Sequence, residues 1–310
     1  MSALSRDRGN PLEEAAHWFA ELAADEVDPA TERAWERWLQ ADSRHAVAWA
    51  RVEEISGRFR ALPASGRAVL ARRDSLGRRH ALKMLSLALG GLALGWNRGD
   101  DWRLGQGAEL STAVGEIRAF ALAEGTRVWL DTDSQLAREA APGRWRLLRG
   151  EALFEQQSGA PSLLLETAFG RVRLGAGCCG VRSRDDGLEV AAFRGVQQLF
   201  PRQARPQGLS EGTRALMTAT VVQPLGRVDP GRQLWRQGRL VVNDWSLGAL
   251  VDELARYRPG LLTCTATVAS LRVVGSYPLD DTDRALAALA DSLPVRVERR
   301  LPWWVQIVPA

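Results

Sequence analysis

The sequence predicts a multidomain protein of the α plus β class, and three observations lead to this prediction. Tryptophans recur at helical spacing near the N-terminus, a stretch without charged residues follows at 84–96, and short alternating strand patterns dominate after residue 102. The 310 residues suffice for two or three domains. The expected segments are a helical module at 1–62, a basic linker at 63–80, a transmembrane helix at 81–97, an all-β domain at 98–225 and an α/β module at 228–310.

Composition narrows the class of protein. Hydrophobic residues make up 45% and charged residues 25% of the chain, which is ordinary for folded protein. The net charge of +4 comes from basic residues spread along the chain, so direct binding to nucleic acid is not expected. The histidines and cysteines form no metal-ligand pattern, so no metal ion or cofactor is expected. Cys178, Cys179 and Cys264 do not make a disulfide framework and fit small core residues.

Three short amphipathic helices are expected in the N-terminal module. The first begins at Pro11, the second covers 30–40, and the third runs from Ser43 until Gly57 loosens it; Pro29 is expected to interrupt the pattern. Helices this short are marginal alone, so their apolar faces must pack on one another or on a partner. Both a shared core and a partner-binding surface fit these faces. The residues concerned are Trp18, Leu22, Trp35, Trp38, Leu39 and Trp49.

The apolar stretch at 81–97 has three interpretations. Its first 16 residues would extend roughly 24 Å, short of the roughly 30 Å hydrocarbon core of a membrane, so a buried core helix and a signal-peptide segment are alternatives. A basic flank that includes Arg78, Arg79 and Lys83 precedes the uncharged part at 84–96, and acids follow it. This pattern is typical of a single span with the N-terminus in the cytoplasm, which we favour.

Residues 78–83 also resemble the twin-arginine export signature. Ala81 stands where that signature usually has an aromatic residue, and no A-x-A-like cleavage site follows Leu94. An uncleaved anchor is therefore expected, while the export route stays open.

Strand patterns separated by turn residues predict the all-β domain, with strands at 126–130, 145–148, 162–166 and 171–174 and an irregular connection at 202–212. Beyond residue 230, strand–helix–strand order occurs twice, which predicts a compact α/β module. Its strands are expected at 239–242, 261–268, 271–277, 295–299 and 303–308, and its two helices carry Leu247 to Leu254 and Leu286 to Leu293.

Two strings resemble catalytic or cofactor motifs, and their context argues against both. G-x-S-x-G at 208–212 has no strand leading in, and every histidine precedes Ser210. G-x-G-x-x-G at 175–180 is followed by a hairpin pattern, whereas a dinucleotide site needs a helix there, so these glycines fit a bend or bulge. No catalytic constellation is visible, and an enzyme is not expected.

Several segments together resemble the FecR-type anti-sigma regulators. At the N-terminus these are A-x-x-W ending at Trp18 and HAVAW at 45–49; in the β region, TAFGRVRLGAG at 167–177 and VAAFRGVQQLFP at 190–201. The C-terminal part carries WRQGRLVVNDWSLGALVDELARYRPG at 235–260 and VVGSYPLDDTDRALAALADSLP at 273–294. The chain departs from the family at 177–179, where members usually have a G-T-x-F-like run.

The resemblance implies a bacterial inner-membrane protein with a cytoplasmic N-terminus and a periplasmic C-terminal region. It further implies an extracytoplasmic-function sigma factor as cytoplasmic partner, and the signalling domain of a TonB-dependent outer-membrane receptor, of the siderophore or iron type, as periplasmic partner. Sigma release would require periplasmic and intramembrane proteases. The C-terminal module is similar to the secretin/TonB short N-terminal domain.

A sheet edge in the C-terminal module offers a candidate receptor contact. Small strand–helix–strand units leave edges to which another chain can add a strand, and Leu240, Val241 and Val242 begin the module. For Val241 alone, a core position fits at least as well. Two rival functions also stay open: an inner-membrane-anchored envelope scaffold, which needs no sigma-binding helices, and an anchored enzyme, which needs titratable groups after residue 100.

Overall fold

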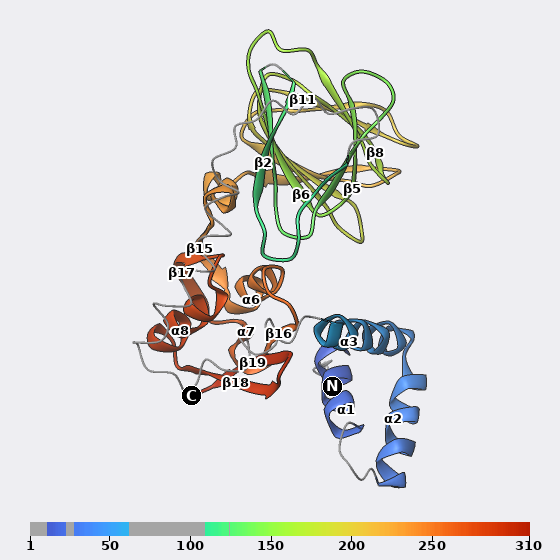
Figure 1. The fold of residues 1–310 in the computed structure, drawn as a ribbon, viewed down its shortest axis with the longest axis vertical. Helices are drawn as coiled ribbons and strands as arrows, with labels where there is room; N and C mark the ends of the chain where they lie inside the picture. The colour runs from blue at the N-terminus through green and yellow to red at the C-terminus, as the bar shows by residue number, and fades with distance from the viewer. Residues whose placement is uncertain (1–10, 23–27, 62–108, 124) are drawn as a thin grey trace, which may run out of the picture.

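The computed structural model describes residues 11–22, 28–61, 109–123 and 125–310. Figure 1 shows N-terminal helices at one end, a β domain at the other and the C-terminal module between them, which confirms the α plus β class. Within these ranges, no helix has both the length and the apolar character that crossing a membrane requires. The predicted linker and span, with Arg78, Arg79 and Lys83, lie outside the described residues.

The N-terminal helices are α1 (Pro11–Leu22), α2 (Pro29–Ala41) and α3 (Ser43–Ala61). The second helix begins one residue earlier than predicted, because Pro29 is its first residue, and Asp28 caps it by accepting from the backbone N–H of Ala30 at 2.9 Å. Proline suits a first helical position, where its missing N–H is not needed. Gly57 lies inside α3, which continues four residues further than expected.

In the described part of the chain, residues 109–227 form two seven-stranded sheets. Sheet A has the order β1-β4-β5-β7-β8-β11-β12, with β1 (Glu109–Ser111), β4 (Gln135–Arg138), β5 (Arg144–Arg149), β7 (Leu163–Glu166), β8 (Gly170–Leu174), β11 (Gln197–Pro201) and β12 (Gln207–Leu209). Sheet B has the order β14-β13-β10-β9-β6-β3-β2, with β2 (Arg118–Ala123), β3 (Thr126–Leu130), β6 (Glu151–Gln156), β9 (Gly177–Ser183), β10 (Leu188–Arg194), β13 (Thr213–Met217) and β14 (Val222–Arg227).

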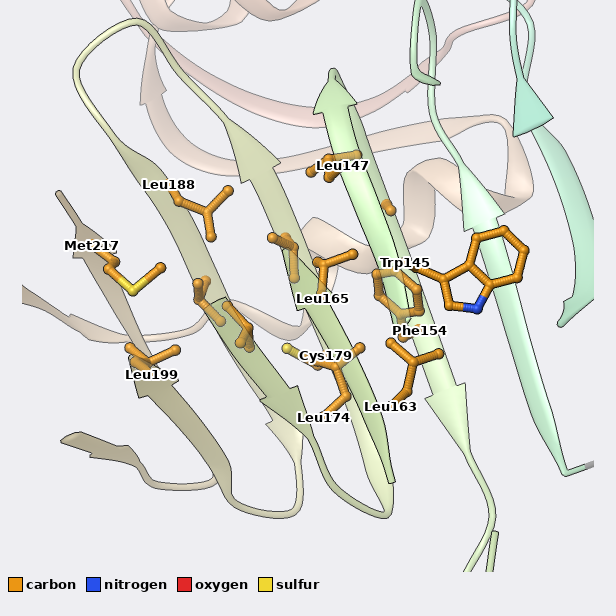
Figure 2. Packing of buried hydrophobic residues seen from close by; sticks show 14 of the residues in the cluster. Trp145, Leu147, Phe154, Leu163, Leu165, Leu174, Cys179, Leu188, Leu199 and Met217 are labelled. Carbon is orange, nitrogen blue, oxygen red and sulfur yellow. The ribbon is translucent and has the colours of Figure 1, made fainter. Parts of the chain in front are cut away.

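The core of the β domain lies between the two sheets, because alternate side chains of each strand point to opposite faces. Figure 2 shows Trp145 and Leu165 from sheet A packed with Phe154, Cys179 and Met217 from sheet B, all of them buried. Cys178 faces the other side of β9, so the adjacent cysteines are buried in two different cores, as free thiols.

The glycine-rich string at 175–180 forms the connection from β8 to β9 and the first residues of β9 rather than a phosphate loop. Gly177 has φ +127°, and a Cβ there would overlap the carbonyl oxygen of Arg194 on β10. A Cβ on Gly195 would likewise overlap the carbonyl oxygen of Ala176. Two glycines therefore allow the ends of β9 and β10 to approach. The connection predicted at 202–212 is not wholly irregular, because β12 lies within it and pairs with β11.

The C-terminal module comprises the 3-10 helix η1 (Pro230–Gln237), β15 (Arg239–Ser246), α6 (Leu247–Ala255), β16 (Leu261–Cys264), α7 (Ala266–Ala269), β17 (Arg272–Pro278), α8 (Thr282–Ser292), β18 (Val295–Leu301) and β19 (Trp304–Pro309). β15 pairs with β17, and β19 lies between β16 and β18. The strand predicted at 261–268 stops at Cys264, because Thr265 begins the short helix α7. Ser246 and Asp281 cap α6 and α8 with their side chains.

Candidate functional site

The six apolar residues singled out in the N-terminal helices are all half-buried in the structure. The four tryptophans make two groups of ring contacts. Trp18 lies 6.4 Å from Trp38, while Trp49 lies 5.0 Å from Trp35 and 5.8 Å from Phe19, measured between ring centroids. The helices thus share an aromatic cluster and still leave part of it accessible.

Helix α2 contributes two of the four tryptophans, Trp35 and Trp38. None of its residues is fully buried, although it carries Trp35, Trp38 and Leu39 on one face. Trp38 is held in place, since its Nε1–H donates to Glu14 at 2.6 Å and its ring stacks on His45 at 4.4 Å. An ordered aromatic surface with limited burial has the features of a binding anchor.

In the structure the helical module also contacts the C-terminal module. His17 packs edge-on against Trp304 with ring centroids 4.8 Å apart, Phe19 packs against Trp303 at 5.3 Å, and the side-chain amide of Gln306 donates to Glu13. The contact pairs helix α1 with apolar side chains around strand β19.

The candidate receptor-contact residues lie on β15. Leu240 and Val242 point inward and are only 6% and 1% exposed, whereas Val241 is half-buried. Within the described residues, β15 pairs on one side in a two-stranded sheet. The 3-10 helix η1 packs against β15, with Gly231 next to the Val241 backbone, and the side chains of Leu240 and Val242 pack in the core of the module.

A buried ionic joint, which the sequence interpretation missed, connects the β domain to the C-terminal module. Asp131 is fully buried directly after β3; it accepts hydrogen bonds from the Tyr257 hydroxyl at 2.8 Å and forms an ion pair with Arg256 at 2.9 Å. Arg256 also contacts Glu151 on β6 at 3.1 Å and Glu253 on α6.

Further polar contacts complete this ionic joint. Arg182 on β9 contacts Glu253 at 2.8 Å, and the Thr132 hydroxyl donates to the backbone carbonyl of Arg256 at 2.9 Å. The apolar residues beneath them also come from both modules, with Leu153 and Cys178 packing in the same core as Trp235. Buried charges need such complete pairing to offset their desolvation, so the two modules are held in a specific relative position.

The carboxylates of the joint respond differently to burial. Burial raises the pKa of Glu253, but Arg256 and Arg182 outweigh that effect and hold the pKa at about 2. Burial also raises the pKa of Asp131, and there it outweighs the attraction of Arg256. A carboxyl whose pKa is lowered by folding stabilises the fold at pH values above its pKa in the unfolded chain. A carboxyl whose pKa is raised by folding stabilises the fold when it is protonated.

We therefore expect the β domain and the C-terminal module to be most stable in mild acid. Protonation of Asp131 should raise the stability as the pH falls from neutral to the unfolded Asp pKa of about 3.9. Protonation of Glu253 should lower the stability as the pH falls further, below the unfolded Glu pKa of about 4.3. Thermal unfolding of the full chain from pH 3 to pH 7 measures this. In Glu253→Gln, the loss of stability below about pH 4.3 should be smaller than in the unmodified chain. An equal loss in both would contradict the lowered pKa of Glu253.

The comparisons with known proteins agree with this architecture. Residues 108–196 match the family model described as FecR protein, and residues 13–55 match the model described as a domain of unknown function, DUF4880. Two crystal structures of a proposed anti-sigma factor from Parabacteroides distasonis share the fold, with TM-scores of 0.52 and 0.53. Each is 16% identical, covers 66% of this chain and is itself covered over 99% of its length. No curated protein matches the chain.

The all-β domain joined to a small α/β module makes the described part of this chain after residue 108 a two-module protein of the α plus β class. Within that class, the two family matches confirm the resemblance of this chain to the FecR-type anti-sigma factors.

Proposed function

We propose that this protein is a transmembrane anti-sigma factor. The helical module would hold an extracytoplasmic-function sigma factor in the cytoplasm, and the β domain and C-terminal module would face the periplasm. Contact with the signalling domain of a TonB-dependent receptor, of the siderophore or iron type, would start cleavage by periplasmic and intramembrane proteases and so release the sigma factor. The observation that carries the sigma-binding step is the half-buried aromatic surface around Trp38 on α2.

The test of the sigma-binding step is co-purification of a sigma factor with the full chain from its native host. The expected result is an extracytoplasmic-function sigma factor bound in a fixed ratio. A chain that retains no sigma factor would contradict the proposal and favour an envelope scaffold.

The proposed topology has a consequence for the contact between α1 and β19. A membrane between residues 61 and 109 would separate Glu13 from Gln306, so this contact and the proposed topology exclude each other within one inserted chain. After insertion, the surface around Phe19 and the surface around Trp303 would each be free to meet a partner on its own side.

We expect reporter fusions and a cysteine pair to give the same answer on topology. A phosphatase fused at residue 60 should be inactive, and one fused at residue 310 should be active, because the basic flank holds the N-terminus in the cytoplasm. A chain with Glu13→Cys, Gln306→Cys and Cys264→Ser should form no disulfide between positions 13 and 306 in cells. A disulfide mapped between these two positions would place both modules on one side and refute the proposed span.

The receiving role of the C-terminal module has a separate test. Deleting residues 228–310 should abolish ligand-dependent transcription in a strain with the cognate receptor, while sigma retention by the helical module should persist. A charged substitution at Leu240 or Val242 is no test of receptor contact, because both side chains are buried and the module would unfold. Val241→Lys, at a half-buried position on the same strand, is the better variant.

A further inference from the structure

An arginine cleft lies between the outer face of sheet B and the C-terminal module. Its volume is about 430 Å³, within the ~300–1,000 Å³ range of ligand pockets. Strands and turns of the β domain contribute Arg182, Arg184, Arg214 and Arg227, and η1 contributes Arg232. The rest of the lining is Asp229, Trp245, Ala249, Asp252 and Glu253.

One buried carboxylate organises three of the arginines. Glu189 on β10 is 7% exposed, and its Oε1 accepts from Arg214 at 3.0 Å and from Arg232 at 2.8 Å. Its Oε2 accepts from Arg184 at 2.9 Å. Burial raises the pKa of Glu189, but Arg232 and Arg184 outweigh burial and lower it, so this carboxylate is ionised at neutral pH. The Glu189 carboxylate therefore holds three guanidinium groups in place, and most of the N–H donors of these groups do not bond to it.

The other walls of the cleft restrict what can bind. Trp245 is half-buried, and the guanidinium of Arg232 lies over its ring at 5.7 Å, which gives a flat apolar surface next to positive charge. On the opposite side, α6 contributes Asp252 and also Glu253, which is already paired with Arg182 and Arg256. A phosphate group concentrates its negative charge near one point and would be repelled by Asp252, whereas carboxylates spaced along a chain can pair with the arginine forks away from it.

We propose that the arginine cleft binds an acidic polypeptide segment, with side-chain carboxylates on Arg184, Arg214, Arg227 and Arg232 and the peptide chain against Trp245. Under the proposed function, on which the identity of the partner rests, this segment belongs to the periplasmic partner protein. The position of the cleft at the junction of both modules lets one bound segment contact the β domain and the C-terminal module together.

The experiment measures binding of a dye-labelled peptide, acetyl-Glu-Gly-Glu-Gly-Glu, to the purified full chain in detergent by fluorescence anisotropy. We expect saturable binding that weakens as salt rises, because the contacts are ionic. Arg227→Gln or Arg232→Gln should weaken binding about tenfold. The matched control is Arg205→Gln, on the exposed loop between β11 and β12 of sheet A, which should change binding less than twofold.

Near-ultraviolet circular dichroism guards against loss of fold as the explanation, because it should be the same in Arg227→Gln, Arg232→Gln and the unmodified chain. Three results would each overturn the proposal: equal binding of the same peptide with glutamine for glutamate, displacement of the peptide by equimolar inorganic phosphate, or full binding by Arg227→Gln and Arg232→Gln. Sigma co-purification tests the proposed function separately, because it does not involve this cleft.

Discussion

Replacing Arg256 by methionine should cost about 3–5 kcal/mol in the free energy of unfolding. Breaking a buried ion pair by removing one partner leaves an uncompensated buried charge, and costs of this size follow. Arg256 is a strong case because its guanidinium contacts three carboxylates, those of Asp131, Glu151 and Glu253, at the junction of two modules. Thermal unfolding of the full chain measures the loss.

Arg272→Met is the matched control for this prediction. Arg272 also pairs with a carboxylate, Asp244 at 2.6 Å, but the two side chains are 58% and 69% exposed. Exposed pairs contribute roughly 0–1 kcal/mol, so this variant should unfold nearly as the unmodified chain does. Equal destabilisation by the two substitutions would mean that the joint around Arg256 contributes no more than a surface ion pair.

Trp38→Ala should abolish sigma retention. The substitution removes the stacking on His45 and the hydrogen bond to Glu14, and it opens the aromatic cluster at Trp18. Because Trp38 is half-buried, we expect a stability cost near the lower end of the roughly 3–5 kcal/mol seen for buried aromatic residues. An anchor tryptophan at an interface contributes roughly 2 kcal/mol or more to binding, which alone weakens retention more than tenfold.

The measurement combines sigma co-purification with thermal unfolding of the full chain, and Arg51→Ala, an exposed position on α3, is its control. Trp38→Phe separates the two contributions of Trp38, since it keeps an aromatic ring and loses the N–H donor to Glu14. If Trp38→Ala melts like the unmodified chain and also keeps its sigma factor, Trp38 is neither a core residue nor a binding anchor.

The class of fold could be predicted from local patterns, because alternation within each strand reports which side chains face the core. The run at 126–130 alternates between buried and more exposed positions, as expected for a strand with one face in the core. The helical module was equally visible in the spacing of its tryptophans. The start of α2 could be predicted only to within one residue, because a proline that ends one helix and a proline that begins the next look alike without the cap at Asp28.

The ionic joint and the arginine cleft could not be predicted in the same way. Asp131 follows a strand as a solvated turn acid would, and its partner Tyr257 lies 126 positions further along the chain. Glu189 and Arg232 are likewise unremarkable in sequence and meet only after sheet B is complete. The burial of Leu240 could not be predicted either. An apolar strand at the start of a module has the same sequence pattern whether its side chains face a partner or the core.

The place of β19 in its sheet sets an order of assembly during synthesis. β19 is the middle strand, and both of its neighbours, β16 and β18, precede it in the chain. While the ribosome is still making residues 304–309, those two strands have nothing to pair with, and the apolar layer that Trp304 and Ile307 later fill is open. The nascent C-terminal module therefore emerges as an unfinished sheet, and a chain that terminates a few residues early would present two unpaired strand edges to chaperones and proteases.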